Sequence, residues 1–282
     1  MWKKHLVMNL SRAADMSFAD QLKLLKATGF DGFFVTWGKD LNLTELMEQA
    51  QAADISIQSI HAPWDKAADM WHGSEEKANA GILELRTCID ACVQCGAPIL
   101  VVHAIVGFDK HTPTQIGLSR FAQAVDYAAE KGIQIAFENT EGEEYLEALM
   151  DYFADNDAVG FCWDSGHELC YNHSQDLLAK YGSRLLGTHL NDNLGIKAYD
   201  GTITWLDDLH LLPFDGIVDW DDVVKRLHRW GIQGPLTFEL NLKSKPGRHE
   251  NDLYCEMPYA RYVAEAYKRA CRIAAMLIAA EN

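Results

Sequence analysis

The chain has 282 residues, with 25 Lys and Arg against 41 Asp and Glu, which gives a net charge of −16. So acidic a protein repels phosphate backbones and anionic lipid, which argues against binding to nucleic acid or to a membrane surface. A composition of 48% hydrophobic and 23% charged residues excludes global disorder and is typical of a globular protein.

Short β-branched or aromatic runs alternate with longer amphipathic runs, and this unit occurs eight times. Most of the short runs are continuously apolar, as expected for parallel strands that are buried on both faces. The predicted strands span residues 5–10, 32–36, 56–61, 99–103, 134–138, 159–164, 185–190 and 236–240. The predicted helices span residues 17–28, 43–53, 75–96, 114–131, 143–154, 174–181, 220–230 and 258–280.

The organisation of these units favours a closed barrel. Gly29, Gly96, Gly132 and Gly231 each follow a helical run, where a left-handed C-cap is expected. No Pro/Gly/Ser-rich linker divides the units, and no G-x-G-x-x-G follows the first strand, which disfavours a dinucleotide-binding sheet. The sequence therefore predicts one (β/α)₈ barrel domain over residues 1–282. The long connection 191–218 is rich in Asp, His and Gly, and loops of that length are usually functional.

An ionisable residue stands at the end of each of six successive predicted strands. The carboxyl ends of parallel barrel strands converge on one mouth, so we expect these side chains to meet there. The residues are His61, His103, Glu138, Asp164 with His167, His189 with Asp192, and Glu239, and the long connection adds Asp208 and His210.

A lone His at a strand end is more often a structural residue than a ligand, but the set is different. Carboxylates gathered at one mouth repel one another unless a cation lies among them. Carboxylate oxygens and neutral imidazoles are ligands for divalent metals. The sequence therefore predicts a divalent cation and leaves Mn²⁺, Mg²⁺, Co²⁺ and Zn²⁺ open.

The cysteines suggest packing and reduced thiols. Cys88, Cys92 and Cys95 have the C-x₃-C-x₂-C spacing of some iron–sulfur sites, but they fall on one face of a predicted helix, where buried cysteine acts as a small apolar residue. Seven scattered cysteines do not indicate a disulfide framework. No stretch reaches the roughly 18 apolar residues of a membrane span, and the start does not resemble a secretory signal. We expect a cytoplasmic protein.

Other side chains near the predicted mouth have two interpretations. Trp37, Trp64 and Phe108 follow three neighbouring strands and either wall a small polar substrate or anchor loops. The basic residues Lys243, Lys245 and Arg248 follow the last strand and either bind a phosphate or carboxylate or lie in solvent.

The ordered set of strand-end residues resembles the xylose-isomerase-like barrel superfamily of sugar phosphate isomerases and epimerases. The segments THLNDN, DLHLLPFDGIVDW and TFELN are especially similar to that family's later motifs. The resemblance covers nearly the whole chain. The sequence is similar to those of tagatose 3-epimerase, hydroxypyruvate isomerase and inosose dehydratase. This resemblance implies a metal-dependent enzyme that acts on a small sugar.

The resemblance also implies a role for each residue. One divalent metal is held by Glu138, Asp164, His189 and Glu239, and the two glutamates move a proton of the substrate through an enediolate. A metal makes this proton transfer feasible because it stabilises the developing oxyanion by several kcal/mol. His61, His103, His167 and Trp64 are expected to contact substrate, and Asp208 and His210 are candidates for a further metal.

Three alternatives stay open at this point. A dehydratase of the inosose type uses the same metal ligands. The superfamily also includes trinuclear-zinc endonucleases that cleave abasic DNA, and His61, His103, Asp208 and His210 match their extra ligands, although the net charge of −16 disfavours a grip on DNA. A barrel that binds a sugar without turnover is the third. Gly195 departs from relatives that carry Arg there, and the oligomeric state, a homo-oligomer included, is not determined.

Overall fold

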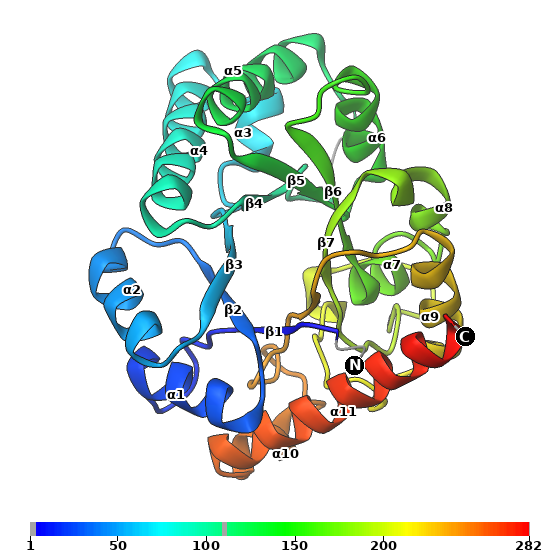
Figure 1. Ribbon diagram of the computed structural model, residues 1–282. Helices are drawn as coiled ribbons and strands as arrows, with labels where there is room; N and C mark the ends of the chain where they lie inside the picture. Colours follow the sequence, from blue (N-terminus) through cyan, green and yellow to red (C-terminus); the bar gives the residue numbers. More distant parts are fainter. Residues whose placement is uncertain (1–3, 109–111, 282) are drawn as a thin grey trace.

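A computed structural model describes residues 4–108 and 112–281, which form a barrel of eight parallel strands ringed by helices (Figure 1). The chain order of the strands is also their order in space, since the sheet runs β7-β6-β5-β4-β3-β2-β1-β8. The strands are β1 (Leu6–Asn9), β2 (Gly32–Thr36), β3 (Ser56–His61), β4 (Ile99–His103), β5 (Gln134–Glu138), β6 (Val159–Asp164), β7 (Leu185–His189) and β8 (Leu236–Phe238).

The ring closes between β7 and β8. The backbone N–H of Leu190 donates to the carbonyl of Thr237 at 2.8 Å, and the N–H of Thr237 donates to Oγ1 of Thr188 at 3.1 Å. Within the described residues, regular parallel pairing between the two strands is limited to one isolated bridge, which joins Leu190 and Phe238. The predicted (β/α)₈ barrel is confirmed. The strands β1, β7 and β8 are one or two residues shorter than predicted because their ends leave the regular ladder.

The long helices agree with the predicted amphipathic runs. They begin at capping side chains such as Ser17, Asn42 and Thr114, each of which accepts a hydrogen bond from a backbone N–H of the first turn. The helices are α1 (Phe18–Thr28), α2 (Leu43–Ala52), α3 (Ala67–His72), α4 (Glu75–Cys95), α5 (Gln115–Lys131), α6 (Glu143–Tyr152), α7 (Ser165–Cys170), α8 (Leu177–Tyr181), α9 (Trp220–Arg229), α10 (Asp252–Glu256) and α11 (Tyr259–Ala280).

Two features of the helices differ from the sequence prediction. The run predicted from residue 174 becomes helical only at Leu177, because Ser174 has a left-handed φ of 56° and Asp176 caps the helix by accepting from Ala179 N–H at 3.0 Å. The short helices α3, α7 and α10 were not predicted, since five or six residues are too few to show a helical period.

The three cysteines of α4 pack in the core. Cys88, Cys92 and Cys95 are all buried and free. Burial raises the pKa of both Cys88 and Cys92, which disfavours the thiolate that a metal cluster needs. The packing interpretation is confirmed.

The two-residue period of the strands directs the strand-end residues into the barrel. In β4, Ile99 and Val101 contribute to a small cluster with Ala136 and Cys162 from the two next strands, while the intervening residues join the large core around the barrel. His103 continues the series Ile99, Val101 and therefore points inward.

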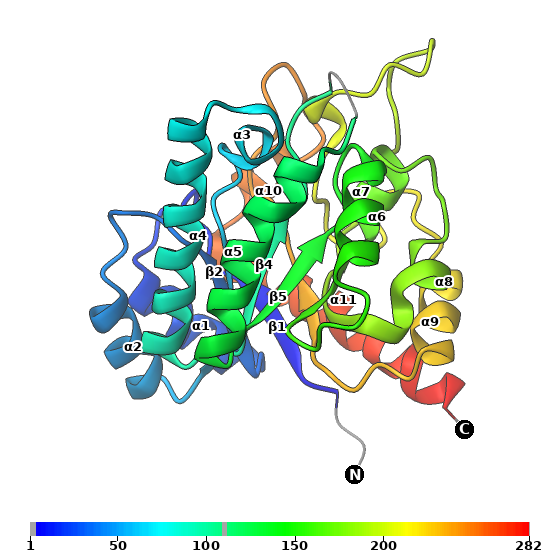
Figure 2. The same cartoon turned by 90° about the horizontal axis from the view of Figure 1, so that it is seen from above.

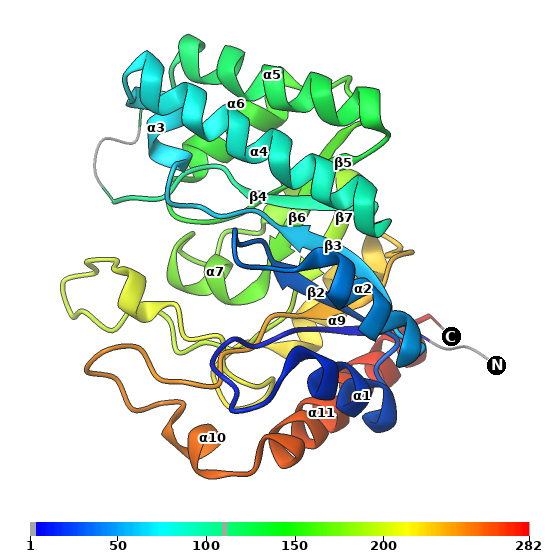
Figure 3. The same cartoon turned by 90° about the vertical axis from the view of Figure 1, so that its left-hand side faces the viewer.

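The carboxyl ends of the strands and the long connections share one end of the barrel. Figure 2 shows the connection after β7 reaching far beyond that end, with both termini at the opposite end. In Figure 3 this connection lies beside the one between β8 and α10, and both extend past the strand tips. The mouth is therefore walled by loops, and the inner cluster closes the barrel below it.

Candidate metal centre

The four predicted metal ligands come together at the mouth. Glu138, Asp164 and His189 end their strands, Glu239 follows β8, and one ligand atom of each lies within 4.8 Å of the other three. Nδ1 of His189 lies 2.8 Å from Glu138 Oε1 and 3.0 Å from Glu239 Oε2, and its ring stacks on Phe34 at 4.8 Å between centroids. Ligand atoms about 2.1 Å from one ion lie about 3 Å apart, so this spacing fits one divalent cation.

Asp164 is oriented from two sides. Its Oδ1 accepts from the backbone N–H of His167 at 2.6 Å, which makes Asp164 the N-cap of α7. Its Oδ2 accepts from the side-chain amide of Asn191 at 2.7 Å, and the amide of Asn139 exchanges two hydrogen bonds with the Asp164 backbone. Contacts of this kind fix the direction in which a ligand faces a metal.

Two histidines face the other oxygen of Glu138. Nε2 of His61 lies 3.1 Å and Nε2 of His103 lies 3.3 Å from Glu138 Oε2. Nδ1 of His61 lies 2.7 Å from the carbonyl oxygen of Ala62, and because a carbonyl only accepts, Nδ1 carries a hydrogen. Nε2 of His61 can therefore face the Glu138 carboxylate favourably only with a proton or a metal cation between the two atoms.

The same arrangement recurs around Asp208. Nδ1 of His167 donates to the carbonyl of Asn139 at 2.9 Å, and Nδ1 of His210 donates to the carbonyl of Glu239 at 3.1 Å. Their Nε2 atoms lie 3.3 Å and 2.7 Å from Asp208 Oδ1. Either both rings are protonated or a cation lies beside Asp208. We call these nine residues the mouth cluster: His61, His103, Glu138, Asp164, His167, His189, Asp208, His210 and Glu239.

The carboxylates of the mouth cluster depend on the charge of their neighbours. Burial opposes the charge of Glu138, but the surrounding histidines, His189 above all, hold its pKa well below the usual value. Burial raises the pKa of Asp164 to about 6. Burial also opposes the charge of Glu239, but His189 and His210 lower its pKa to about 2. A bound divalent cation would stabilise the ionised form of all three carboxylates.

A cavity of about 530 Å³ opens above the cluster, and we call it the mouth cavity. Six residues of the mouth cluster reach it, together with side chains of the loops. Trp64 and Phe108 line it, which agrees with one of their two interpretations, whereas Trp37 packs on the core and lines a separate cavity. The lining side chains are His61, Trp64, His103, Val106, Phe108, Glu141, His167, Tyr171, Trp205, Asp208, His210, Glu239, Asn241 and Lys245.

Comparison with known proteins decides the family. Residues 22–258 match the family described as the xylose isomerase-like TIM barrel. This chain belongs to that family. A relative, the uncharacterized protein y4fM of Sinorhizobium fredii (strain NBRC 101917 / NGR234), is 27% identical to this chain over 278 residues. The match covers 84% of this chain and 84% of y4fM.

Solved barrels resemble this family member over nearly their whole length. The structure of L-ribulose 3-epimerase matches with a TM-score of 0.73 and 13% identity, covering 99% of this chain and 96% of that one. The IolI protein with a binding zinc atom matches with a TM-score of 0.71 and 17% identity, covering 97% and 98%. The TM-scores establish a common fold. Each helix of the described residues is too short or too polar to cross a membrane.

Two family-motif positions lie away from the cavity. Asp192 does not join the mouth cluster, because its carboxylate accepts from the N–H groups of Phe214 and Val218 and from Trp220 Nε1, and so anchors the long connection. Gly195 has a φ of 71° and does not line the mouth cavity.

The predicted basic cluster divides. Lys245 lines the mouth cavity, and its Nζ lies 3.1 Å from Asp208 Oδ2. Arg248 instead pairs with Asp207 at 3.0 Å and Glu250 at 2.8 Å, and Lys243 is exposed. The three side chains do not form one anion site.

Sequence reasoning missed the amides that orient Asp164. Asn139 directly follows Glu138, and Asn191 lies two residues after His189. A polar amide beside a predicted ligand at a strand end is the available signal. Glu141, Tyr171, Trp205 and Asn241 give no comparable signal because loop geometry alone brings them to the cavity.

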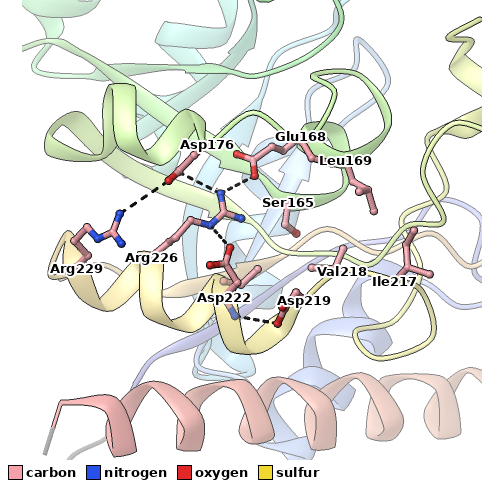
Figure 4. Close-up of a pocket in the computed structure, with 12 residues that line it drawn as sticks. Ser165, Glu168, Leu169, Asp176, Ile217, Val218, Asp219, Asp222, Arg226 and Arg229 are labelled. Atoms are coloured by element: carbon pink, nitrogen blue, oxygen red, sulfur yellow. Dashed lines mark hydrogen bonds and ion pairs between the residues drawn. The ribbon is translucent and has the colours of Figure 1, made fainter. Parts of the chain in front are cut away.

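A second cluster of charge lies between α7 and α9 (Figure 4). Arg226 of α9 pairs with Glu168 at 2.6 Å, Asp222 at 2.9 Å and Asp176 at 3.3 Å, beside a cavity of about 290 Å³. Trp163 Nε1 donates to Glu168 at 2.8 Å, and the guanidinium lies 4.9 Å from the Trp163 ring centroid. We call these four charged residues the Arg226 cluster. Its members pair with one another and join α7, α8 and α9.

Proposed function

We propose that this family member is a divalent-metal-dependent isomerase or epimerase that acts on a small ketose or keto-polyol. The observation that carries the proposal is the convergence of Glu138, Asp164, His189 and Glu239 within 4.8 Å below the mouth cavity. The names of similar structures, an epimerase and a zinc-binding protein, agree with it. Small sugars, and neither nucleic acid nor membrane, are the proposed partners.

The residues suit proton transfer beside a carbonyl group. A bound Mn²⁺, Co²⁺, Mg²⁺ or Zn²⁺ would neutralise the carboxylates and polarise the substrate carbonyl, worth several kcal/mol. Glu239 lines the cavity with 18% of its side chain exposed, whereas Glu138 is fully buried and contacted on both oxygens. Of the two glutamates, Glu239 is therefore the group that first removes the substrate proton. Glu138 comes within reach of the substrate only when the substrate binds.

Histidines at the cavity wall complete this chemistry. His167 and His103 both line the cavity, with Nε2 of His167 3.3 Å from Asp208 and Nε2 of His103 3.3 Å from Glu138. They can donate to the oxygens of the substrate as charge develops during proton transfer. Loss of a hydroxyl group after the same proton removal gives the dehydratase alternative, and product analysis separates the two reactions.

The test couples metal removal to isotope exchange. Protein dialysed against a chelator should lose exchange of solvent deuterium into a ketose in D₂O, as followed by NMR, and Mn²⁺ or Co²⁺ should restore it. Full exchange by the chelated protein, with metal absent by elemental analysis, would show the proposal to be wrong. Binding of a ketose with no exchange would instead indicate a binding protein.

A second candidate is the trinuclear-zinc phosphodiesterase that acts on abasic DNA. The specific observation in its favour is the presence of further candidate ligand groups, one made of His61, His103 and Glu138 and one of Asp164, His167 and His210. The net charge of −16 disfavours this second function, because binding to duplex DNA needs several phosphate contacts from Lys or Arg. It predicts about three metals per chain and nicking of an abasic duplex, whereas the first proposal predicts one metal and no nicking.

A further inference from the structure

The outer part of the mouth cavity is lined by exposed aromatic side chains. Trp64, Phe108 and Trp205 are 44%, 39% and 52% exposed, and all three line this one cavity. We call them the aromatic rim. Large apolar side chains that remain exposed around one concave site mark a surface that binds something.

The aromatic rim is fixed in place. Trp64 stacks on His103 with centroids 5.4 Å apart and an interplanar angle of 17°, so one face is covered and the other is available. Phe108 packs on Tyr171 at 5.9 Å. Trp205 begins the 3₁₀ helix Trp205–Asp207, whose backbone is held by a capping box between Thr204 and Asp207, and the Lys245 ammonium lies 5.6 Å from the Trp205 ring centroid. Rings held this way bind with little loss of conformational entropy.

The proposed chemistry uses only the inner end of the cavity. Proton transfer needs the carbonyl carbon and its neighbour beside Glu239, whereas the whole cavity of about 530 Å³ falls in the range that holds drug-sized ligands. The aromatic rim therefore remains for a part of the substrate that does not react.

The polar groups of the cavity indicate the charge of that part. Glu141, Asp208 and Glu239 line the cavity with a single ammonium group, Lys245, which already pairs with Asp208 at 3.1 Å. The amide of Asn241 adds a neutral donor and acceptor. Outside the mouth cluster, a phosphate group would meet the carboxylate of Glu141 and an ammonium group that is already paired, whereas neutral hydroxyl groups can donate to Glu141.

We propose, building on the proposed isomerase or epimerase function, that the substrate is a ketose carrying a second, neutral sugar ring. The ketose end lies at the mouth cluster, and the second ring lies in the aromatic rim. Its apolar C–H face stacks on the exposed aromatic rings, and its hydroxyl groups bond to Glu141, Asn241 and Lys245. A phosphorylated ketose is excluded as the preferred substrate.

Deuterium exchange with a panel of four ketoses tests this. The panel is D-fructose, D-fructose 6-phosphate, isomaltulose (glucose on O6 of fructose) and lactulose (galactose on O4 of fructose). With Mn²⁺ present, kcat/KM for one of the two glycosylated ketoses should exceed that for D-fructose about tenfold. Exchange into D-fructose or its phosphate that equals or exceeds exchange into both disaccharides overturns the substrate class and leaves the isomerase function standing. Exchange into none of the four overturns the isomerase function itself.

A variant pair ties the preference to the aromatic rim. Trp205→Ala should lower the ratio of disaccharide to monosaccharide kcat/KM about tenfold. Tyr199→Ala is the matched control, because Tyr199 is a fully exposed aromatic residue of the same connection that does not line the cavity. Both variants should keep the thermal midpoint of the native protein. An unchanged ratio in a folded Trp205→Ala protein overturns the assignment of the second ring to the rim.

Discussion

The mouth cluster and the Arg226 cluster both contain buried carboxylates, Glu138 and Asp164 in the first and Glu168 in the second, but they neutralise their carboxylates differently. In the Arg226 cluster, one guanidinium lies within 3.3 Å of three carboxylates (Figure 4). In the mouth cluster, among residues 4–108 and 112–281, imidazoles face every carboxylate and only Asp208 also pairs with an ammonium group, that of Lys245. A cluster that carries its own permanent cation is structural, whereas one that pairs carboxylates with imidazoles is suited to take up a cation.

Among the variants considered, Glu138→Gln should have the largest effect, a loss of exchange activity and of bound metal at the mouth cluster. Glu138 contacts three histidines of the mouth cluster, so its loss removes a charge on which the whole cluster depends. We expect exchange activity to fall about a thousandfold, which corresponds to the several kcal/mol that a metal contributes. Elemental analysis should show bound metal reduced in parallel.

The matched control for Glu138→Gln is Glu168→Gln, which changes an equally buried glutamate in the Arg226 cluster. That variant should keep its metal and lose stability instead, because Glu168 bonds to Arg226 and Trp163. Wild-type exchange rates in Glu138→Gln, or metal loss in Glu168→Gln alone, would contradict the division between the two clusters.

Arg226→Met should have the next largest effect, and it should be on stability. Removing the guanidinium leaves Glu168, Asp176 and Asp222 without their common partner, and breaking a buried ion pair costs about 3 kcal/mol. Urea unfolding measures this loss. Arg229→Met is the control, since Arg229 is exposed and its nearest carboxylate oxygen is 4.0 Å away, so about 0.5 kcal/mol or less is expected. Equal losses in both variants would be inconsistent with a structural role for Arg226.

The sequence allowed the strands and their terminal side chains to be predicted because both follow from periodicity. A residue that ends a buried parallel strand, such as His103 or Glu138, reaches the mouth whatever the loops do. Trp205 and Glu141 were not predictable as cavity residues, because loop conformation places them. The helix α7 is too short to carry a period, yet its first turn orients Asp164. The sequence prediction placed Asp192 at the mouth, but its carboxylate instead accepts hydrogen bonds from loop N–H groups.

Asn191→Ala tests whether the outer contacts of the mouth cluster matter for metal binding. The amide of Asn191 holds Asp164 Oδ2 at 2.7 Å, and loss of such a contact typically weakens metal affinity about 10- to 100-fold. Competition with a chelating dye measures the affinity. Asn193→Ala is the control, because its amide bonds to Asp207 and Gly195 in the same loop. Equal affinities in the two variants would show that Asp164 needs no support.

Lys245→Met should have the smallest effect and separates one metal from several. The Lys245 ammonium lies 3.1 Å from Asp208 Oδ2, where it supplies the positive charge that a second cation would otherwise bring to Asp208, His167 and His210. The Lys245 ammonium and a second cation at Asp208 would carry like charges, and close like charges near a protein surface repel each other by a few kcal/mol at most. Removing the ammonium should therefore raise the affinity for a second Zn²⁺ several-fold while the first site is unchanged, as measured by zinc titration followed by elemental analysis. If the wild-type protein already binds three metals and the variant binds no more tightly, Lys245 does not oppose a second cation, and the mouth cluster is a multinuclear site.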